Sequence, residues 1–144
     1  MTPDLQQLVA ALREELKHYG EMLALLEQQQ QSVSSRAADQ TFAATAAVQR
    51  QAEVIVTARR STETRRHALA RELRQDENST ILQLMPLLPP QYRPLLQSLV
   101  EENKTLFKSV QRAARENHQL LSRSAESMQR FLEMLFPGTE PVAA

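Results

Sequence analysis

The chain has 144 residues, its 17 lysines and arginines balance 17 aspartates and glutamates, and it contains two glycines, no cysteine and no tryptophan. A sequence without cysteine excludes disulfides, thiolate nucleophiles and cysteine-ligated metal sites. No apolar run approaches the roughly 20 residues that a membrane-spanning helix needs, and the first residues lack the pattern of a secretory signal. We therefore expect a cytoplasmic location. Most residues are Ala, Leu, Gln, Glu, Arg or Lys, which are good helix formers and predict an all-α fold.

The first predicted helix covers residues 3–36. Thr2 can cap it, Pro3 suits its first position, and Asp4 complements the positive end of the helix dipole. Its apolar side chains recur at alternating spacings of three and four residues, which is typical of a coiled-coil-like seam. This predicted seam consists of Leu5, Val9, Leu12, Leu16, Tyr19, Leu23, Leu26, Gln30 and Val33.

A second long helix is predicted over residues 39–74, after a joint rich in Gln and Ser. Asp39 is its expected cap because a short acidic side chain can accept a hydrogen bond from the first turn. The seam of this helix is thinner and more polar than that of the first. It consists of Val48, Ala52, Ile55, Thr62, Leu69 and Leu73.

A short apolar helix is predicted over residues 79–88, with Asn78 or Ser79 as its cap. The pair Pro89-Pro90 should end it, because proline lacks a backbone donor and restricts the residue before it.

The last predicted helix covers residues 91–136 and is followed by a flexible tail over residues 137–144. The helix lengths favour a single domain over residues 1–144, in which the short helix folds back on the start of the last one. We expect an elongated antiparallel bundle of three long helices plus one short helix, with coiled-coil-like packing.

Nothing in the sequence indicates an enzyme. The three histidines His18, His67 and His118 are scattered and lack the spacing of a metal-binding helix, and two glycines cannot form a glycine-rich phosphate loop. We therefore expect no catalytic residues, no metal site and no cofactor.

Arginines are concentrated at the end of the second predicted helix, and most of them lie on one side of it. They can simply form a solvated flank of the bundle, or they can dock on an acidic protein surface. Nucleic acid is a weak alternative, because no aromatic residues alternate with the arginines. The candidate docking patch consists of Arg59, Arg60, Arg66, Arg71 and Arg74.

Two asparagines, Asn103 and Asn117, occupy equivalent positions of the apolar seam in the last helix. A buried asparagine at such a position costs stability but specifies the register of neighbouring helices. A register role is therefore expected, with contact to a partner protein as the alternative.

The apolar residues of the two ends of the bundle are poorly matched. Residues 28–47, near the hairpin tip, are mostly Gln, Ser, Thr and Ala, whereas the last helix carries two apolar stripes at that end. An uncovered stripe can bind an amphipathic partner helix, dimerise, or pack into an ordinary core. The candidate partner-binding residues are Leu120, Leu121, Met128, Phe131, Leu132, Leu135 and Phe136.

The order of these features resembles the FlgN-type chaperones of flagellar type III export. The similar segments are the Leu-Leu-Glu-Gln stretch over residues 25–31, the joint at Ala38-Asp39, the arginine-rich end of the second helix, and Asn117-His118-Gln119-Leu120-Leu121. The last of these matches an Asn-x-x-Leu-Leu motif of the family.

The resemblance implies a cytoplasmic chaperone that binds the C-terminal helices of hook-filament junction proteins, chiefly through its own last helix. It also implies delivery to the export gate or to components of the ATPase complex, without insertion into the membrane. A structural coiled-coil oligomer or adaptor subunit without chaperone activity, including a homodimer, is the alternative. A nucleic-acid-binding protein would instead require salt-dependent binding through the arginines.

Overall fold

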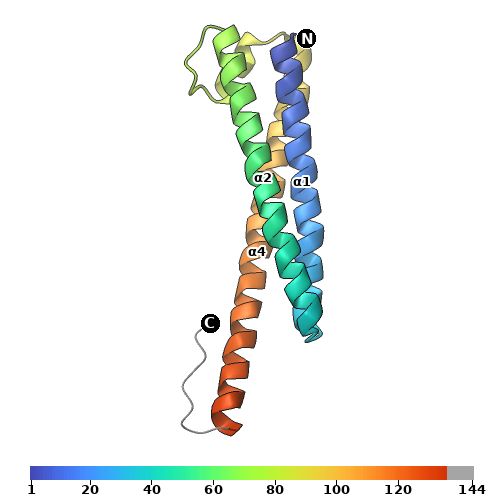
Figure 1. Cartoon of the computed structure of the whole chain (residues 1–144). Coiled ribbons are helices and arrows are strands. Elements are labelled where there is room, and N and C mark those ends of the chain that lie inside the picture. The colour runs from blue at the N-terminus through green and yellow to red at the C-terminus, as the bar shows by residue number, and fades with distance from the viewer. Residues whose placement is uncertain (136–144) are drawn as a thin grey trace.

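The computed structural model describes residues 1–135, apart from the side chains of Ser127, Met128, Phe131 and Leu135. The expected tail over residues 137–144 lies outside the described residues. The all-α fold with three long helices and a short one is confirmed (Figure 1). The elements are α1 (Pro3–Ser34), α2 (Ala38–Glu72), α3 (Ile81–Leu84), the 3-10 turns η1 (Met85–Leu87) and η2 (Pro90–Tyr92), and α4 (Arg93–Leu135).

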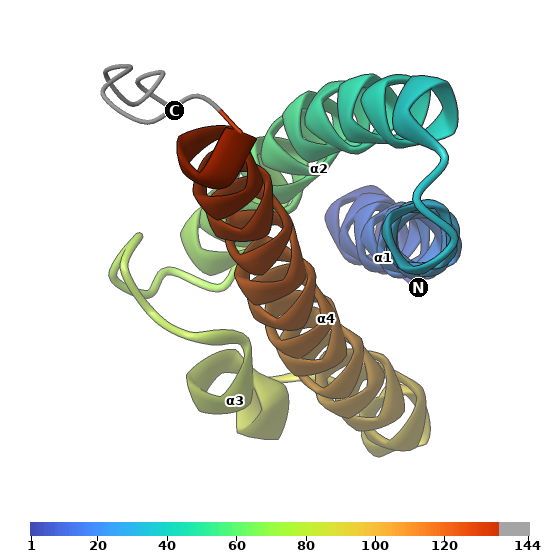
Figure 2. The same ribbon diagram turned by 90° about the horizontal axis from the view of Figure 1, so that it is seen from below.

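Helices α1 and α2 form an antiparallel hairpin, and α4 packs chiefly on α1 (Figures 1 and 2). Helix α4 runs parallel to α1, because Asn103 donates to the carbonyl of Leu12 and Asn117 to that of Leu26. Both bonds join residues that are 91 positions apart. The two helices therefore keep one register over about four turns.

The start of α1 follows the sequence expectation, since the Thr2 hydroxyl accepts a bond from the Leu5 amide. Each hairpin helix is followed, two residues after its last residue, by an arginine with positive φ. The angles are 56° at Arg36 and 58° at Arg74. At the first of these ends, the Ala37 amide donates to the carbonyl of Ser32, which closes a Schellman motif. Because this motif ends the helix, α1 stops at Ser34 and not at residue 36.

The expected cap of α2 is wrong. The cap residue is Ala37, which has no capping side chain, and Asp39 lies inside the first turn. Three residues separate the two helices, and all three belong to the Schellman turn. The last of them, Ala37, is therefore also the residue that precedes α2. Asp39 still complements the helix dipole from its position in the first turn.

The expected cap and length of the short helix are also wrong. Thr80, and neither Asn78 nor Ser79, caps α3, and it forms a capping box with Gln83. The α-helical part is one turn long and continues as a 3-10 turn, because Pro86 supplies no amide hydrogen for a longer helix. A second 3-10 turn starts at Pro90, so that α4 begins at Arg93 and not at residue 91.

The core consists of two apolar clusters. The larger joins α1, α2, α3 and α4 at the end of the bundle that holds the N-terminus, and it includes the fully buried Leu8, Leu84 and Leu96. The smaller lies nearer the hairpin tip and is centred on Tyr19, Met22, Leu26 and Ile55. Apolar burial therefore decreases from the α3 end towards the tip.

The predicted seam of α1 is only half right. Leu5, Val9, Leu12, Tyr19 and Leu26 are buried, but the other predicted seam residues are only partly buried or exposed. Helix α1 contacts both α2 and α4, so its buried face is wider and centred differently from a two-helix seam. The residues that complete the buried face are Leu8, Glu15, Met22, Gln29 and Ser32.

Replacing Gly20 by alanine is expected to stabilise the fold. Gly20 lies in the interior of α1, and a Cβ added there meets no atom within 4 Å. Because glycine lowers helix stability relative to alanine, the free energy of unfolding should rise by about 0.5 to 1 kcal/mol. Urea unfolding followed by circular dichroism measures the change. An unchanged or lower midpoint would contradict this prediction.

Candidate partner-binding surface

The end of α4 projects beyond the hairpin tip (Figure 1). The offset of 91 residues between α1 and α4 places Ser34, the last residue of α1, level with Ala125. Residues 126–135 of α4 therefore have no counterpart in α1, and at 1.5 Å per residue they extend about 15 Å past it. We call residues 126–135 the overhang.

The candidate partner-binding residues lie partly beside the hairpin and partly in the overhang. Leu120 and Leu121 are half-buried beside the hairpin. In the overhang, Leu132 is 37% exposed and Met134 is 81% exposed. The side chains of Met128, Phe131 and Leu135, and the whole of Phe136, lie outside the described residues. The overhang thus presents apolar side chains that the hairpin is too short to cover.

A polar layer separates the apolar core from the overhang. The buried Asn117 donates to the carbonyl of Leu26 at 2.7 Å and to Gln29 Oε1 at 3.0 Å. The Gln29 amide in turn donates to the hydroxyl of Thr45 at 3.1 Å, which links α4, α1 and α2. Hydrogen bonding therefore replaces apolar packing where the three helices meet near the tip.

Asn103 is the second buried asparagine of α4. Its amide donates to the carbonyls of Leu12 and Leu99, at 3.1 and 2.8 Å. Its Oδ1 atom is buried and has no hydrogen-bond partner among the described residues. An unpaired buried carbonyl lowers the stability of the fold. That Asn103 in return specifies the register of α4 against its neighbours remains our prediction.

Arg59 is tied to the bundle by its contacts, although its side chain is 51% exposed. Its guanidinium lies 4.3 Å from the centre of the Phe107 ring, and its Nε is 3.8 Å from Glu15. The same carboxylate accepts a bond of 3.0 Å from the hydroxyl of Tyr19. Burial and the neighbouring Glu15 carboxylate raise the pKa of Tyr19, so the phenol stays protonated. Arg59 thus joins α2 to α1 and α4.

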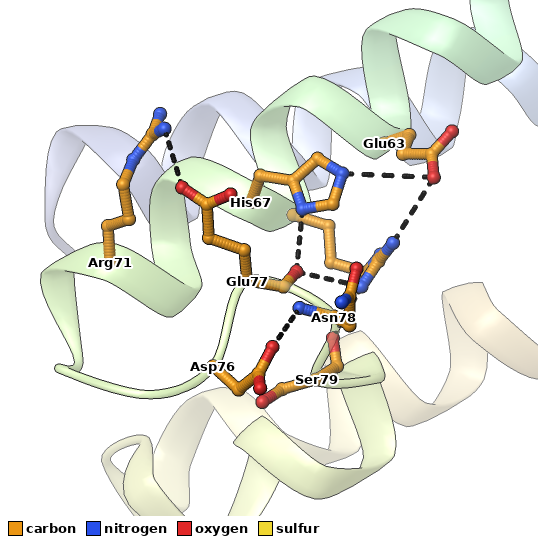
Figure 3. A network of polar contacts seen from close by, with 8 residues as sticks. Glu63, His67, Arg71, Asp76, Glu77, Asn78 and Ser79 are labelled. Carbon is orange, nitrogen blue, oxygen red and sulfur yellow. Dashed lines mark hydrogen bonds and ion pairs between the residues drawn. The ribbon is translucent and has the colours of Figure 1, made fainter.

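Two further arginines hold the loop between α2 and α3 (Figure 3). Arg66 donates to the carbonyl of Ser79 at 2.6 Å, and Arg71 pairs with the carboxylate of Glu77 at 3.1 Å. The His67 ring contacts the carbonyl of Glu77 at 2.6 Å. These side chains fasten a loop that has little apolar burial of its own.

The remaining members of the candidate docking patch are Arg60 and Arg74, and neither is buried. Arg74 is also the residue with positive φ that ends α2. Three of the five arginines contact other parts of the chain, but all except Arg66 are exposed. The docking patch therefore stays a prediction.

No catalytic constellation is present in the described residues. Between α1 and α2 lies a groove of about 600 Å³, lined by Glu14, His18, Arg50 and neighbouring α2 residues. The His18 ring is held between Glu14, at 3.1 Å, and Glu21, at 3.4 Å, on the surface of α1. Residues 1–135 bring no three histidine, aspartate or glutamate side chains into a potential metal site. No helix in the described part of the chain is both long and apolar enough to span a membrane.

An apolar overhang at the end of a three-helix bundle can bind another protein, and a comparison with known families gives a match. The family model described as FlgN protein matches residues 1–143. The chain belongs to the FlgN family. FlgN proteins are flagellar export chaperones, and they bind flagellar substrate proteins. Neither the curated proteins nor the solved structures include a significant match to this FlgN chain.

Proposed function

We propose that this FlgN chain is a cytoplasmic chaperone for the C-terminal helices of hook-filament junction proteins. It holds these helices until the substrate is delivered to the export gate or to components of the ATPase complex. The proposal is supported by membership of the FlgN family and by the apolar overhang of α4. Delivery is a docking step, for which four members of the candidate patch are exposed: Arg59, Arg60, Arg71 and Arg74.

The overhang is the observation that carries the proposal. A partner helix that lies along α4 buries Leu132 together with the neighbouring apolar positions, including Leu120 and Leu121. Burial of each such side chain contributes about 1.5 to 3 kcal/mol. Four or five of them together contribute about 6 to 15 kcal/mol, which opposes the cost of association.

The chemistry of holding the substrate is equilibrium binding. An amphipathic helix exchanges water for the apolar side of α4, so neither nucleotide nor metal is required. While it is bound, the apolar stripe of the substrate cannot pair with another subunit. Release follows when a competing surface, such as the assembling structure, buries the same stripe more completely.

The principal alternative is a structural coiled-coil oligomer or adaptor, in which a second copy covers the overhang. Light scattering on the free chain separates the two. A stable dimer that persists in the presence of a junction protein would favour the alternative, whereas a monomer that forms a one-to-one complex supports the chaperone.

Replacing Leu132 by aspartate tests the proposed function. The side chain is exposed, so helicity and the unfolding midpoint should stay unchanged. Desolvation of the new carboxylate should weaken binding to a purified junction protein by roughly tenfold or more in titration calorimetry. Leu82→Asp, at a residue of α3 that is 61% exposed, is the matched control and should bind normally.

Two results would contradict this proposal. One is normal binding by the Leu132→Asp variant. The other is equal retention of the intact junction protein and of a junction protein that lacks its C-terminal helix.

A further inference from the structure

Helices α2 and α4 diverge towards the hairpin tip. Midway along the bundle they are joined by Arg59, which lies over the Phe107 ring. From there towards the tip, α2 follows α1 while α4 leads away from both, and the two views agree on this (Figures 1 and 2). Helix α4 keeps its contacts with α1 down to Asn117. The side of α2 that would face α4 is therefore uncovered near the tip.

Two exposed apolar side chains of α2, Phe42 and Val56, lie along this uncovered side, with the polar Gln49 midway between them. The three residues are spaced by seven, so they form one stripe on the helix. Val56 is one turn from Arg59, whose side chain reaches α4, so the stripe borders the side of α2 that turns towards α4. Phe42 is 79% exposed and Val56 is 47% exposed.

Phe42 lies at the level of the candidate partner-binding residues of α4. Helices α2 and α4 are antiparallel, and equal steps towards the tip from the Arg59–Phe107 contact lead to Phe42 and Ser124. Leu121 is one helical turn from Ser124. Phe42 is open to solvent, and Leu121 is only half-buried.

We propose that Phe42 of α2 forms a second wall of the partner site, opposite the apolar side of α4. The inference rests on the proposed function, and its occupant is the same amphipathic partner helix. That helix lies lengthwise between the diverging ends of α2 and α4, and its contacts continue past the tip along the overhang. A helix enclosed on two sides buries more of its apolar surface than one lying on α4 alone.

The surroundings of Phe42 specify the chemistry of the partner. Residues 40–49 of α2 carry no charged side chain, so a charge facing them would be desolvated without a counter-ion. The partner helix therefore needs two adjoining apolar stripes, one for α4 and one for Phe42. A helix with a single narrow stripe should bind more weakly.

A Phe42→Trp substitution tests the inference, because the chain contains no tryptophan. The probe is a synthetic peptide of the C-terminal helix of a junction protein, chosen without tryptophan. The emission of the Phe42→Trp variant should be that of a solvated indole in the free chain and should shift to the blue when the peptide is added. Leu87→Trp, at an exposed residue of η1, is the matched control and should show no shift.

Phe42→Ala provides a second measurement on the same peptide. The substituted side chain is exposed, so the unfolding midpoint should not change, while the affinity should fall roughly tenfold because one buried phenyl group is lost. Normal affinity of this variant, together with an unshifted emission spectrum of the Phe42→Trp variant, would overturn the inference, while the Leu132→Asp result would still decide the proposed function. If the unmodified chain does not bind the peptide, both proposals fail.

Discussion

Removal of residues 126–144 is expected to lower the affinity for a junction-protein helix by at least about a hundredfold. The deletion removes the overhang, where α4 has passed the end of α1 at Ser34 and cannot be covered by the hairpin. The same deletion should shift the unfolding midpoint by less than about 2 °C, because no residue that the structure describes as buried lies beyond Asn117. Calorimetric titration and a thermal melt of the same sample measure both effects.

The truncated chain also distinguishes the overhang from the body of the bundle. The truncated chain can retain some binding. If Phe42→Ala then removes it, part of the site lies between the diverging ends of α2 and α4. Full affinity after truncation would contradict a role for the overhang. A large loss of helicity beyond the deleted residues would instead show that the overhang is part of the core.

The Leu8→Ala substitution is expected to lower the free energy of unfolding by about 2 to 5 kcal/mol. Leu8 is fully buried in the larger cluster, where α1 meets α2, α3 and α4. The cavity left by the smaller side chain cannot close without moving several helices, so most of the lost packing is not recovered. Because a bundle of this size has a total stability of roughly 5 to 15 kcal/mol, this loss is a large share of the total. Urea unfolding measures the loss.

Leu82→Ala serves as the control for this experiment. It deletes the same atoms from a side chain of α3 that is 61% exposed, and should change the stability by less than about 0.5 kcal/mol. Equal losses in the two variants would contradict the location of the core. A small loss for Leu8→Ala alone would mean that the α3 end is loosely packed.

The helices themselves follow from local sequence patterns. Composition and the three-and-four spacing predict three long helices, and their ends in the structure lie within two residues of those predicted. The capping residues were harder to predict. Asp39, Asn78 and Ser79 are all good cap residues, but the turn at Arg36 and the hydrogen bonds of the α2–α3 loop place Ala37 and Thr80 at those positions.

The candidate site was predictable only in outline. The mismatch between a polar hairpin tip and an apolar last helix is visible in the sequence, and it indicates the end of α4. The sequence does not reveal that Arg59, Arg66 and Arg71 contact other parts of the chain. It also gives Phe42 no special status, because one phenylalanine among alanines and glutamines has no apolar periodicity around it.

The sequence by itself determined the long helices, because helix propensity and apolar spacing act over one or two turns. It also indicated the class of protein, because the order of its segments resembles the FlgN family. Only the tertiary structure decided how far α4 reaches past the hairpin and which side of α2 stays open. Those properties depend on the level at which α4 packs on α1, which is seen in two asparagine bonds between residues 91 apart. They also depend on the divergence of α2 and α4, which results from the packing of all three helices and not from a local pattern.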